Sequence, residues 1–340
     1  MHLVNYRLYC DAAVKMEGQQ LFRRSCIAVT ICLALTARSQ TAAPTYHGMT
    51  VSVPTLVKEE SGEIAYGLSG ADFTIKDNGV EQRVSMDRGP DAQPISLMLV
   101  IQTGHNAKSQ LAKISRLADL LDSILTNPQD QTAIVTFDGS PHLLQPFTTD
   151  QGAISSVLSS ITSGNSASAL FDAMNLAVLT LRKTPANSQK VIVLISGEHD
   201  HGSVGSDGGS LIQAVASTNA SVYAISFRPG KTEILAKLRT LNPFEMTSSA
   251  MQRNAGQALA DLTGGDFSRF GSEREFEQRM SEVADHLHNQ YSLVFQPDNP
   301  RPGLHSLTVE VPRLKVSVVS ARGGYWVENN GTSGSGGGSE

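Results

Sequence analysis

Four consecutive residues that can bind metals follow an apolar run near the middle of the chain. Glu198, His199, Asp200 and His201 follow "VIVLIS" (191–196) after one glycine. Two histidines and a carboxylate suit Zn²⁺ or Fe²⁺. A serine with a histidine and an aspartate could instead form the nucleophile of a hydrolase. A third interpretation is a polar loop without chemistry of its own.

The spacing of these residues favours the polar loop. In an extended segment, His199 and His201 share a face while Asp200 points away, and no His-Glu-x-x-His motif supports a metal site. Ser196 lies too close in sequence to His199 and Asp200 to form a catalytic triangle easily, and no Gly-x-Ser-x-Gly elbow occurs. We therefore expect Asp200 to cap the turn that follows it, and we expect no cofactor.

Buried strands alternate with helices around this segment. The apolar runs at 95–101, 132–137, 190–196 and 221–227 are typical of strands buried on both faces. Helical patterns lie between and after them, at 107–125, 152–161, 169–183 (capped by Ser168), 210–217, 251–265 and 272–290. This alternation predicts an α/β fold whose open, mostly parallel sheet is doubly wound and Rossmann-like. We expect this domain at 95–295.

Strand-like segments flank the α/β domain on both sides. Residues 48–90 alternate, and Asp77-Asn78-Gly79 indicates a hairpin turn. Residues 300–327 are also strand-like, and 328–340 form a low-complexity tail that we expect to be disordered. Because neither flank is long enough to bury two faces alone, we expect both to join in one small β-sandwich-like module.

The start of the chain has the pattern of an export signal. Arg23 and Arg24 precede an apolar run, and small residues follow it at Ala37 and Ser39. We expect residues 1–39 to be a signal peptide, with Met16 as an alternative start. All three cysteines lie in this part, so the mature chain would contain none. The sequence thus predicts a secreted or periplasmic protein with no stable membrane anchor after cleavage.

The net charge of −5 gives no indication of nucleic-acid binding, since a mild excess of acidic residues would not neutralise phosphates.

Three segments carry a resemblance to a known family. "LMLVIQTGHNA" (97–107), "SGNSASALFDAM" (163–174) and "KVIVLISGEHDHGS" (190–203) resemble the signature segments of von Willebrand factor A-type domains, and more narrowly those of an exported bacterial family. The resemblance implies a site at the carboxyl edge of the sheet, where an Asp-x-Ser-x-Ser segment, a Thr and an Asp hold a divalent cation for adhesion.

This sequence departs from the family pattern at the metal ligands. The matching positions are Gln102, Gly104, Asn106, Ser168 and Gly197. Both carboxylates are missing, and a hard cation such as Mg²⁺ depends on anionic oxygens. We therefore expect a degenerate site that binds no metal.

The function that follows is non-enzymatic binding of an extracytoplasmic protein or glycan. The expected contact residues are those of the loops at the carboxyl edge, together with the neighbouring histidines, and they are Gln102, Gly104, His105, Asn106, Ser168, Gly197, His199 and Asp200. Binding through histidines would respond to acid, because histidine changes charge near neutral pH. Two alternatives stay open: a metal-dependent adhesion module that uses Asp200 or Glu198, and a cryptic hydrolase or metalloenzyme.

Overall fold

The computed structural model describes residues 49–329, apart from 88–92, 105–106, 228–241, 299 and 315. All of these residues belong to one compact unit, Tyr46–Glu340. The expected signal peptide (1–39) and residues 330–340 of the expected tail lie outside the described residues. No helix in the described part of the chain combines the length and the apolar composition needed to cross a bilayer.

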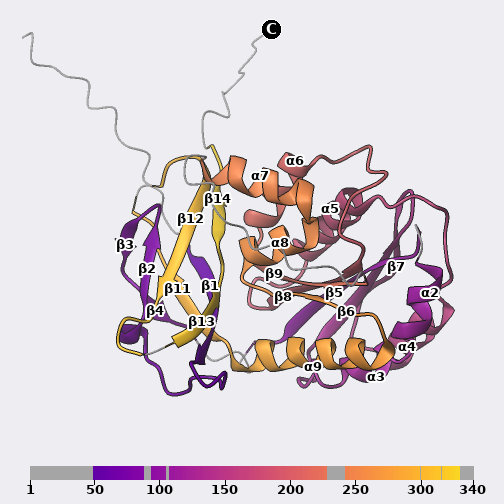
Figure 1. The fold of residues 1–340 in the computed structure, drawn as a ribbon, viewed down its shortest axis with the longest axis horizontal. Helices are drawn as coiled ribbons and strands as arrows, with labels where there is room; N and C mark the ends of the chain where they lie inside the picture. The colour runs from indigo at the N-terminus through magenta and orange to yellow at the C-terminus, as the bar shows by residue number, and fades with distance from the viewer. Residues whose placement is uncertain are drawn as a thin grey trace, which may run out of the picture. The chain divides into compact units, whose positions relative to one another are not determined.

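Six strands form the central sheet in the order β10-β9-β8-β5-β6-β7 (Figure 1). Their bounds are β5 Ile95–Gln102, β6 Gln131–Phe137, β7 Pro141–Thr148, β8 Gln189–Ser196, β9 Ala220–Ser226 and β10 Phe267–Arg269. Neighbouring strands are parallel except for β6 and β7. Every residue of β5 is buried, as expected for a central strand covered on both faces. The predicted mostly parallel sheet is confirmed.

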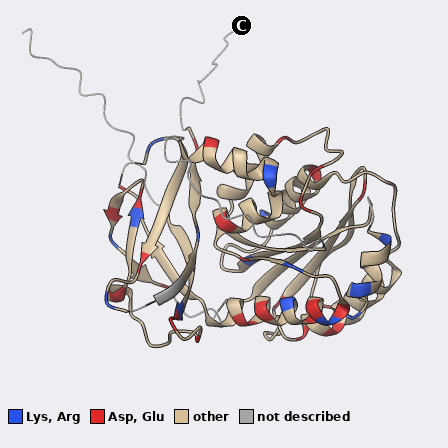
Figure 2. Cartoon of the chain, in the orientation of Figure 1, with Lys and Arg blue, Asp and Glu red and all other residues tan. Residues whose placement is uncertain are grey.

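Helices cover both faces of this sheet, and alternate residues of β5 pack toward opposite sides. Met98 and Val100 pack in one core with α5 (Leu170–Leu181), α6 (Gly208–Ala216), α7 (Pro243–Arg253) and α8 (Ala255–Thr263). Leu97 and Leu99 pack in a second core with α2 (Lys108–Leu111), η3 (Ala112–Ile114), α3 (Leu117–Leu121), α4 (Gln151–Ser160) and α9 (Glu273–Asn289). Acidic and basic residues are interspersed along α9 (Figure 2). The sheet is therefore doubly wound, as the sequence predicts.

Three local predictions differ from the structure. The helix expected at 107–125 is divided into α2, η3 and α3, although its apolar residues Ile114, Leu117 and Leu121 are buried as expected. The helix expected at 251–265 is divided at Asn254, whose side chain accepts from the N–H of Gln257 and starts α8. No structure was predicted for the segment that forms β7; this strand contains two prolines, which an edge strand tolerates since one side of its backbone needs no partner.

Strands from both flanks form two four-stranded sheets, which we call the β module. One of its strands, β11, comes from the end of the segment 95–295, so the α/β domain ends before Tyr291 and not at 295 as expected. One sheet has the order β13-β1-β11-β4 and the other β14-β12-β2-β3. The bounds are β1 Val51–Glu59, β2 Thr74–Asp77, β3 Val80–Gln82, β4 Ser85–Met86, β11 Tyr291–Phe295, β12 Gly303–Glu310, β13 Val316–Ala321 and β14 Gly324–Val327, with a short helix η1 at Gly70–Asp72. Val53, Ile75 and Leu293 are fully buried in its core. The expected joining of the two flanks is confirmed.

The hairpin and the junctions explain how this module is closed. Asn78 and Gly79 have φ values of 48° and 84°, as a tight turn between β2 and β3 requires. The α/β domain is inserted between β4 and β11, which pair with each other. The turn between β13 and β14 contacts the α/β domain, since Arg322 Nη2 donates to the Ala220 carbonyl at 3.0 Å and Gly323 N donates to that of Asp261 at 3.1 Å.

Candidate functional site

The carboxyl ends of β5 and β8 lie side by side at one edge of the central sheet. Ile101 of β5 is the register partner of Ile195 of β8. The chain passes from β5 to β6 on one side and later adds β8 on the other, so the strand order reverses here. Open α/β sheets bind ligands outside such an edge. We call residues 102–104, 138–140, 162–168 and 197–206 the apical loops. His105 and Asn106, both expected contact residues, lie outside the described residues.

Gln102, the last residue of β5, is 1% exposed and joins two apical loops through its amide. Oε1 accepts a hydrogen bond from the N–H of Gly197 at 2.8 Å, and Nε2 donates to the Gly104 carbonyl at 3.1 Å. An amide makes both bonds because it carries an acceptor and a donor, whereas a carboxylate only accepts. This neutral side chain thus connects the loops that follow β5 and β8.

Gly104 lies where the apical loops approach each other most closely. A Cβ at this position would overlap the carbonyl oxygen of Ala167 and would lie 2.8 Å from that of Asn165. At Gly197, by contrast, the nearest atom to such a Cβ would be Gln102 Oε1 at an ordinary 3.5 Å. Gly104 is therefore required for packing of the loops, and Gly197 is much less constrained.

Ser168 is 1% exposed and pairs through its backbone with the loop after β8. Its N–H donates to the His201 carbonyl at 3.3 Å, and the His201 N–H donates back at 2.8 Å. Within the described residues, Ser168 Oγ has no hydrogen-bond partner. The expectation that Ser168 caps α5 is wrong, because that helix starts after Ala169 without a cap from the preceding side chain.

The N-terminus of α5 is capped instead by the loop after β8. Asp200 Oδ1 accepts from the Phe171 N–H at 3.1 Å and from Ser203 Oγ at 2.6 Å, while Oδ2 accepts from the Ser203 N–H at 3.2 Å. In return, the Asp172 N–H donates to Ser203 Oγ at 3.0 Å, and the Asp172 carboxylate accepts from the Val204 N–H at 2.9 Å. A helix N-terminus favours such carboxylates. The predicted turn cap by Asp200 is confirmed, and it also fixes the loop to α5.

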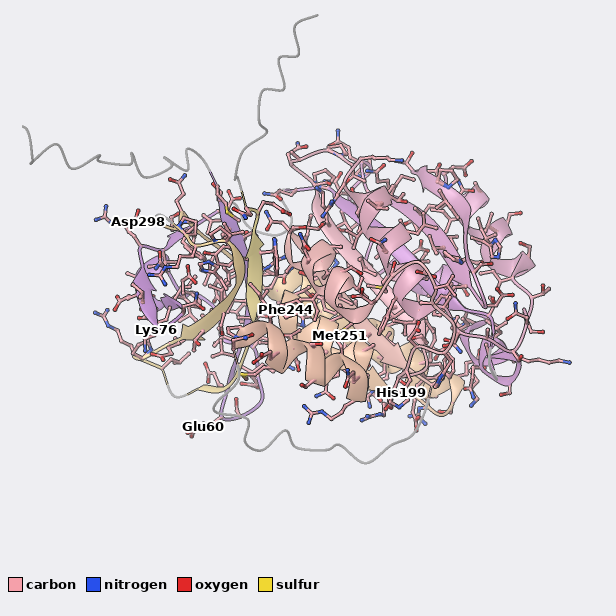
Figure 3. The ribbon with its side chains drawn as sticks, turned by 90° about the horizontal axis from the view of Figure 1, so that it is seen from above. Glu60, Lys76, His199, Phe244, Met251 and Asp298 are labelled. Atoms are coloured by element: carbon pink, nitrogen blue, oxygen red, sulfur yellow. The ribbon has the colours of Figure 1, made fainter. Side chains whose placement is uncertain are left out.

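The remaining residues of the "GEHDH" segment point in different directions. Glu198 Oε1 accepts from Arg269 Nε at 2.7 Å, and both side chains are mostly buried. His199 and His201 are exposed, with their rings edge to face and 6.0 Å between centroids. In Figure 3, His199 lies at the edge of the α/β domain, away from Lys76 and Asp298 of the β module. The four candidate ligands therefore do not converge on one point.

Asp138, at the end of β6, also belongs to the apical loops and was missed by the sequence interpretation. Its Oδ2 accepts from the Asn165 N–H at 3.0 Å, and its Oδ1 accepts from the Ser140 N–H at 3.2 Å. Burial raises the pKa of Asp138, but these amides and that of Gly139 outweigh burial, so the pKa lies below its usual 3.8. Its position directly after the buried run "TAIVTF" was the available signal.

Ser140 and His142 give the nearest approach to catalytic geometry. Ser140 Oγ lies 3.1 Å from His142 Nε2, and Asp138 Oδ1 lies 3.9 Å from that same nitrogen. A catalytic triad places the acid on the other ring nitrogen, where it orients the imidazole. Among the described residues, no three His, Cys, Asp or Glu side chains gather so as to hold a metal ion. The geometry thus fits a hydrogen-bonded group of loops better than a reaction centre.

Comparisons with known proteins locate the α/β domain. Residues 97–199 match the family described as von Willebrand factor type A domain. Similar solved structures include an aerotolerance-related membrane protein from Bacteroides fragilis, with 19% identity, a TM-score of 0.40 and coverage of 56% of this chain and 98% of that one. BatB from Bacteroides thetaiotaomicron has 17% identity, a TM-score of 0.37 and coverage of 56% and 99%. The PilB minor pilin from Streptococcus sanguinis has 10% identity, a TM-score of 0.43 and coverage of 58% and 62%. No curated protein matches this chain.

Proposed function

The chain contains a von Willebrand factor type A domain, and from this premise we propose that it is a non-enzymatic interaction module that acts outside the cytoplasm. It binds a protein or a glycan through exposed residues of the apical loops, and it does so without a divalent cation. The supporting observation is the Gln102 amide, which connects the loops after β5 and β8 by hydrogen bonds at the position where the family resemblance implies a metal-binding carboxylate.

The proposed contact surface is the outer side of the loop after β8. Val204 is 96% exposed, and His199 and His201 are exposed beside it. Asp200 holds the loop on α5, so these side chains are presented on backbone that has little freedom left to lose on binding. Gln102 and Ser168 are buried, so their expected direct contact with a large partner does not fit the structure; in the proposal they shape the loops instead.

The metal-dependent alternative is disfavoured because its ligands are already engaged. Asp200 accepts from α5 and from Ser203, and Glu198 is paired with Arg269. An ion would compete with Arg269 and with the N-terminus of α5 for these carboxylates, and loss of the Glu198 pair would leave a mostly buried Arg269 without its partner. The hydrolase alternative is disfavoured at Ser140, because Ser140 and Asp138 both approach the same nitrogen of His142, whereas a triad needs the acid on the other nitrogen.

The test compares two sets of exposed residues for ligand binding. The apical variant His199→Ala/His201→Ala/Val204→Ala changes the proposed surface, and Val80→Ala/Glu81→Ala changes exposed residues of the β module. Both are assayed beside the wild type on a glycan array and on immobilised extracytoplasmic proteins, after melting curves confirm folding. We expect the apical variant alone to lose at least about tenfold in affinity, the effect of one strong contact residue.

Equal binding by all three proteins, or no ligand for the wild type, would contradict the proposal. Repeating the assay at mildly acidic and mildly alkaline pH shows whether the two exposed histidines contribute through their charge.

A further inference from the structure

A polar cluster lies buried in the core of the β module, far in sequence from the apical loops. Asp77 ends β2, His305 lies in β12 and Tyr325 lies in β14, and these strands are neighbours in the order β14-β12-β2. His305 and Tyr325 are register partners. The three residues are 7%, 6% and 1% exposed, so water does not replace their mutual contacts.

Both ring nitrogens of His305 face hydrogen-bond acceptors. Nδ1 lies 2.7 Å from Asp77 Oδ1, and Nε2 lies 2.7 Å from the carbonyl oxygen of Arg301. A neutral imidazole carries a proton on only one nitrogen. The lone pair of the other nitrogen would then face a lone pair of the acceptor oxygen 2.7 Å away. Only the imidazolium donates to both acceptors.

The carboxylate of Asp77 favours this charge state, because Tyr325 Oη donates to its Oδ2 at 2.7 Å and His305 Nδ1 faces its Oδ1. Tyr325 Oη lies 3.2 Å from His305 Nδ1, farther than the Asp77 oxygen. Asn78 Nδ2 also lies 3.2 Å from Nδ1, but it is a donor and makes no hydrogen bond to a protonated Nδ1, so it is the one contact that opposes the imidazolium. Asn78 Oδ1 accepts from the Ser306 N–H at 3.0 Å, which fixes the turn beside the ring.

The charged groups around His305 leave Asp77 as its partner. Lys76 of β2 pairs with Glu310 of β12 at 2.7 Å. Strands β13 and β14 carry no Asp, Glu, Lys or Arg, while α7, which also contacts β12, carries Glu245 and Arg253. Burial lowers the pKa of His305, but the bonds to Asp77 and Arg301 and the charge of Asp77 outweigh it, so the pKa is raised above 6.5.

We infer that a protonated His305 stabilises the β module. The buried imidazolium connects β2, from the N-terminal flank, to β12 and β14, from the C-terminal flank, and loss of its proton at alkaline pH weakens this connection. The inference is independent of the proposed binding function. Because the pKa is raised in the folded state, the stabilisation is fully present below pH 6.5 and is lost as the pH rises through the raised value. The β module is therefore expected to lose stability at alkaline pH.

The first experiment reads the proton directly on the full wild-type chain. Long-range ¹H–¹⁵N correlation of the histidine rings distinguishes an imidazolium, with two protonated nitrogens, from a neutral tautomer. The His305 signals, assigned with His305→Gln, are expected to be those of an imidazolium at a pH where free histidine is neutral. A neutral His305 ring at pH 7 would overturn the inference.

The second experiment measures unfolding by denaturant between pH 6 and pH 10. In the wild type, the unfolding equilibrium constant should rise by up to about tenfold per pH unit between 6.5 and the raised pKa. His305→Gln should lose this rise. Tyr325→Phe is the matched control, because it removes the Tyr325–Asp77 bond but keeps the His305–Asp77 pair, so it should lower stability and retain the rise. An unchanged pH dependence in His305→Gln would contradict this inference. If that variant does not fold, the His305 signals are assigned by their change in Tyr325→Phe, whose ring lies 4.8 Å from that of His305, and the NMR result decides.

Discussion

The α/β domain and the β module each bury a histidine, and the two side chains differ in protonation. His286 of α9 packs edge to face on Tyr223 with 5.2 Å between centroids, and burial, aided by the charge of Lys58, lowers its pKa to about 4. His305 faces Asp77 and a carbonyl, and it keeps its proton. Burial alone makes a histidine neutral, and a placed carboxylate reverses this.

The apical loops contain no such buried charge among their described residues. Their buried polar side chains are the amide of Gln102 and the hydroxyls of Thr103 and Ser168, while the partly exposed Asp138 and Asp200 accept from backbone N–H groups. The two regions therefore respond to different conditions. The β module depends on a proton shared between side chains, whereas the apical loops depend on close packing and on backbone N–H groups that donate to an amide and to carboxylates.

The largest effect is expected from removing the charge in the β module. Asp77→Ala leaves the imidazolium of His305 and the hydroxyl of Tyr325 without their acceptor, and it should cost about 3–5 kcal/mol in the free energy of unfolding at neutral pH. Asp77→Asn should cost less, because its amide can donate to a neutral ring, and its stability should not depend on pH above 6.5. Denaturant titrations measure both free energies of unfolding. Equal costs for Ala and Asn would show that the β module does not depend on the proton of His305, which would contradict the contrast with the apical loops.

The next effect concerns packing of the apical loops. Gly104→Ala forces a Cβ into the Ala167 carbonyl and should cost about 2–3 kcal/mol, as overpacking does. Gly197→Ala meets only an ordinary contact with Gln102 and should cost about 0.5 kcal/mol or less. Thermal unfolding of the two variants gives the comparison. Similar losses at both positions would show that these loops are not closely packed at Gly104.

A smaller effect is expected at the cap of α5. Asp200→Ala removes the acceptor for the Phe171 and Ser203 N–H groups and should cost about 1 kcal/mol, as loss of a helix cap does. Asp200→Asn keeps an acceptor oxygen and should cost a few tenths. Hydrogen exchange of the Phe171 and Ser203 amides should increase in the alanine variant. Unchanged exchange would show that Asp200 does not hold the loop after β8 on α5.

The architecture was predictable wherever the composition and spacing of a short segment determine its structure. The uniform apolar run of β5 and the turn at Asn78-Gly79 each formed as the sequence indicated. Ser272, the first residue of the helical pattern at 272–290, caps α9 by accepting from the Glu275 N–H. In each case, the interacting residues are neighbours in the sequence, so composition and spacing are sufficient.

The parts that were not predicted depend on residues distant in sequence. Ser168 is adjacent to α5 but does not cap it, because Asp200, 29 positions after Phe171, takes that place. The Asp77–His305 pair joins residues 228 positions apart. The burial of Gln102 follows from its bond to Gly197, and neither local propensity nor motif spacing reports such a contact.

Thermal unfolding of the full chain with Mg²⁺, with Mn²⁺ and with a chelator shows whether the apical loops bind a divalent cation. A ligand that binds only the folded state must raise the melting temperature. Because the Gln102 amide already connects the loops after β5 and β8, the account predicts the same melting temperature in all three conditions. A melting temperature that rises with either cation and falls again with the chelator would contradict it.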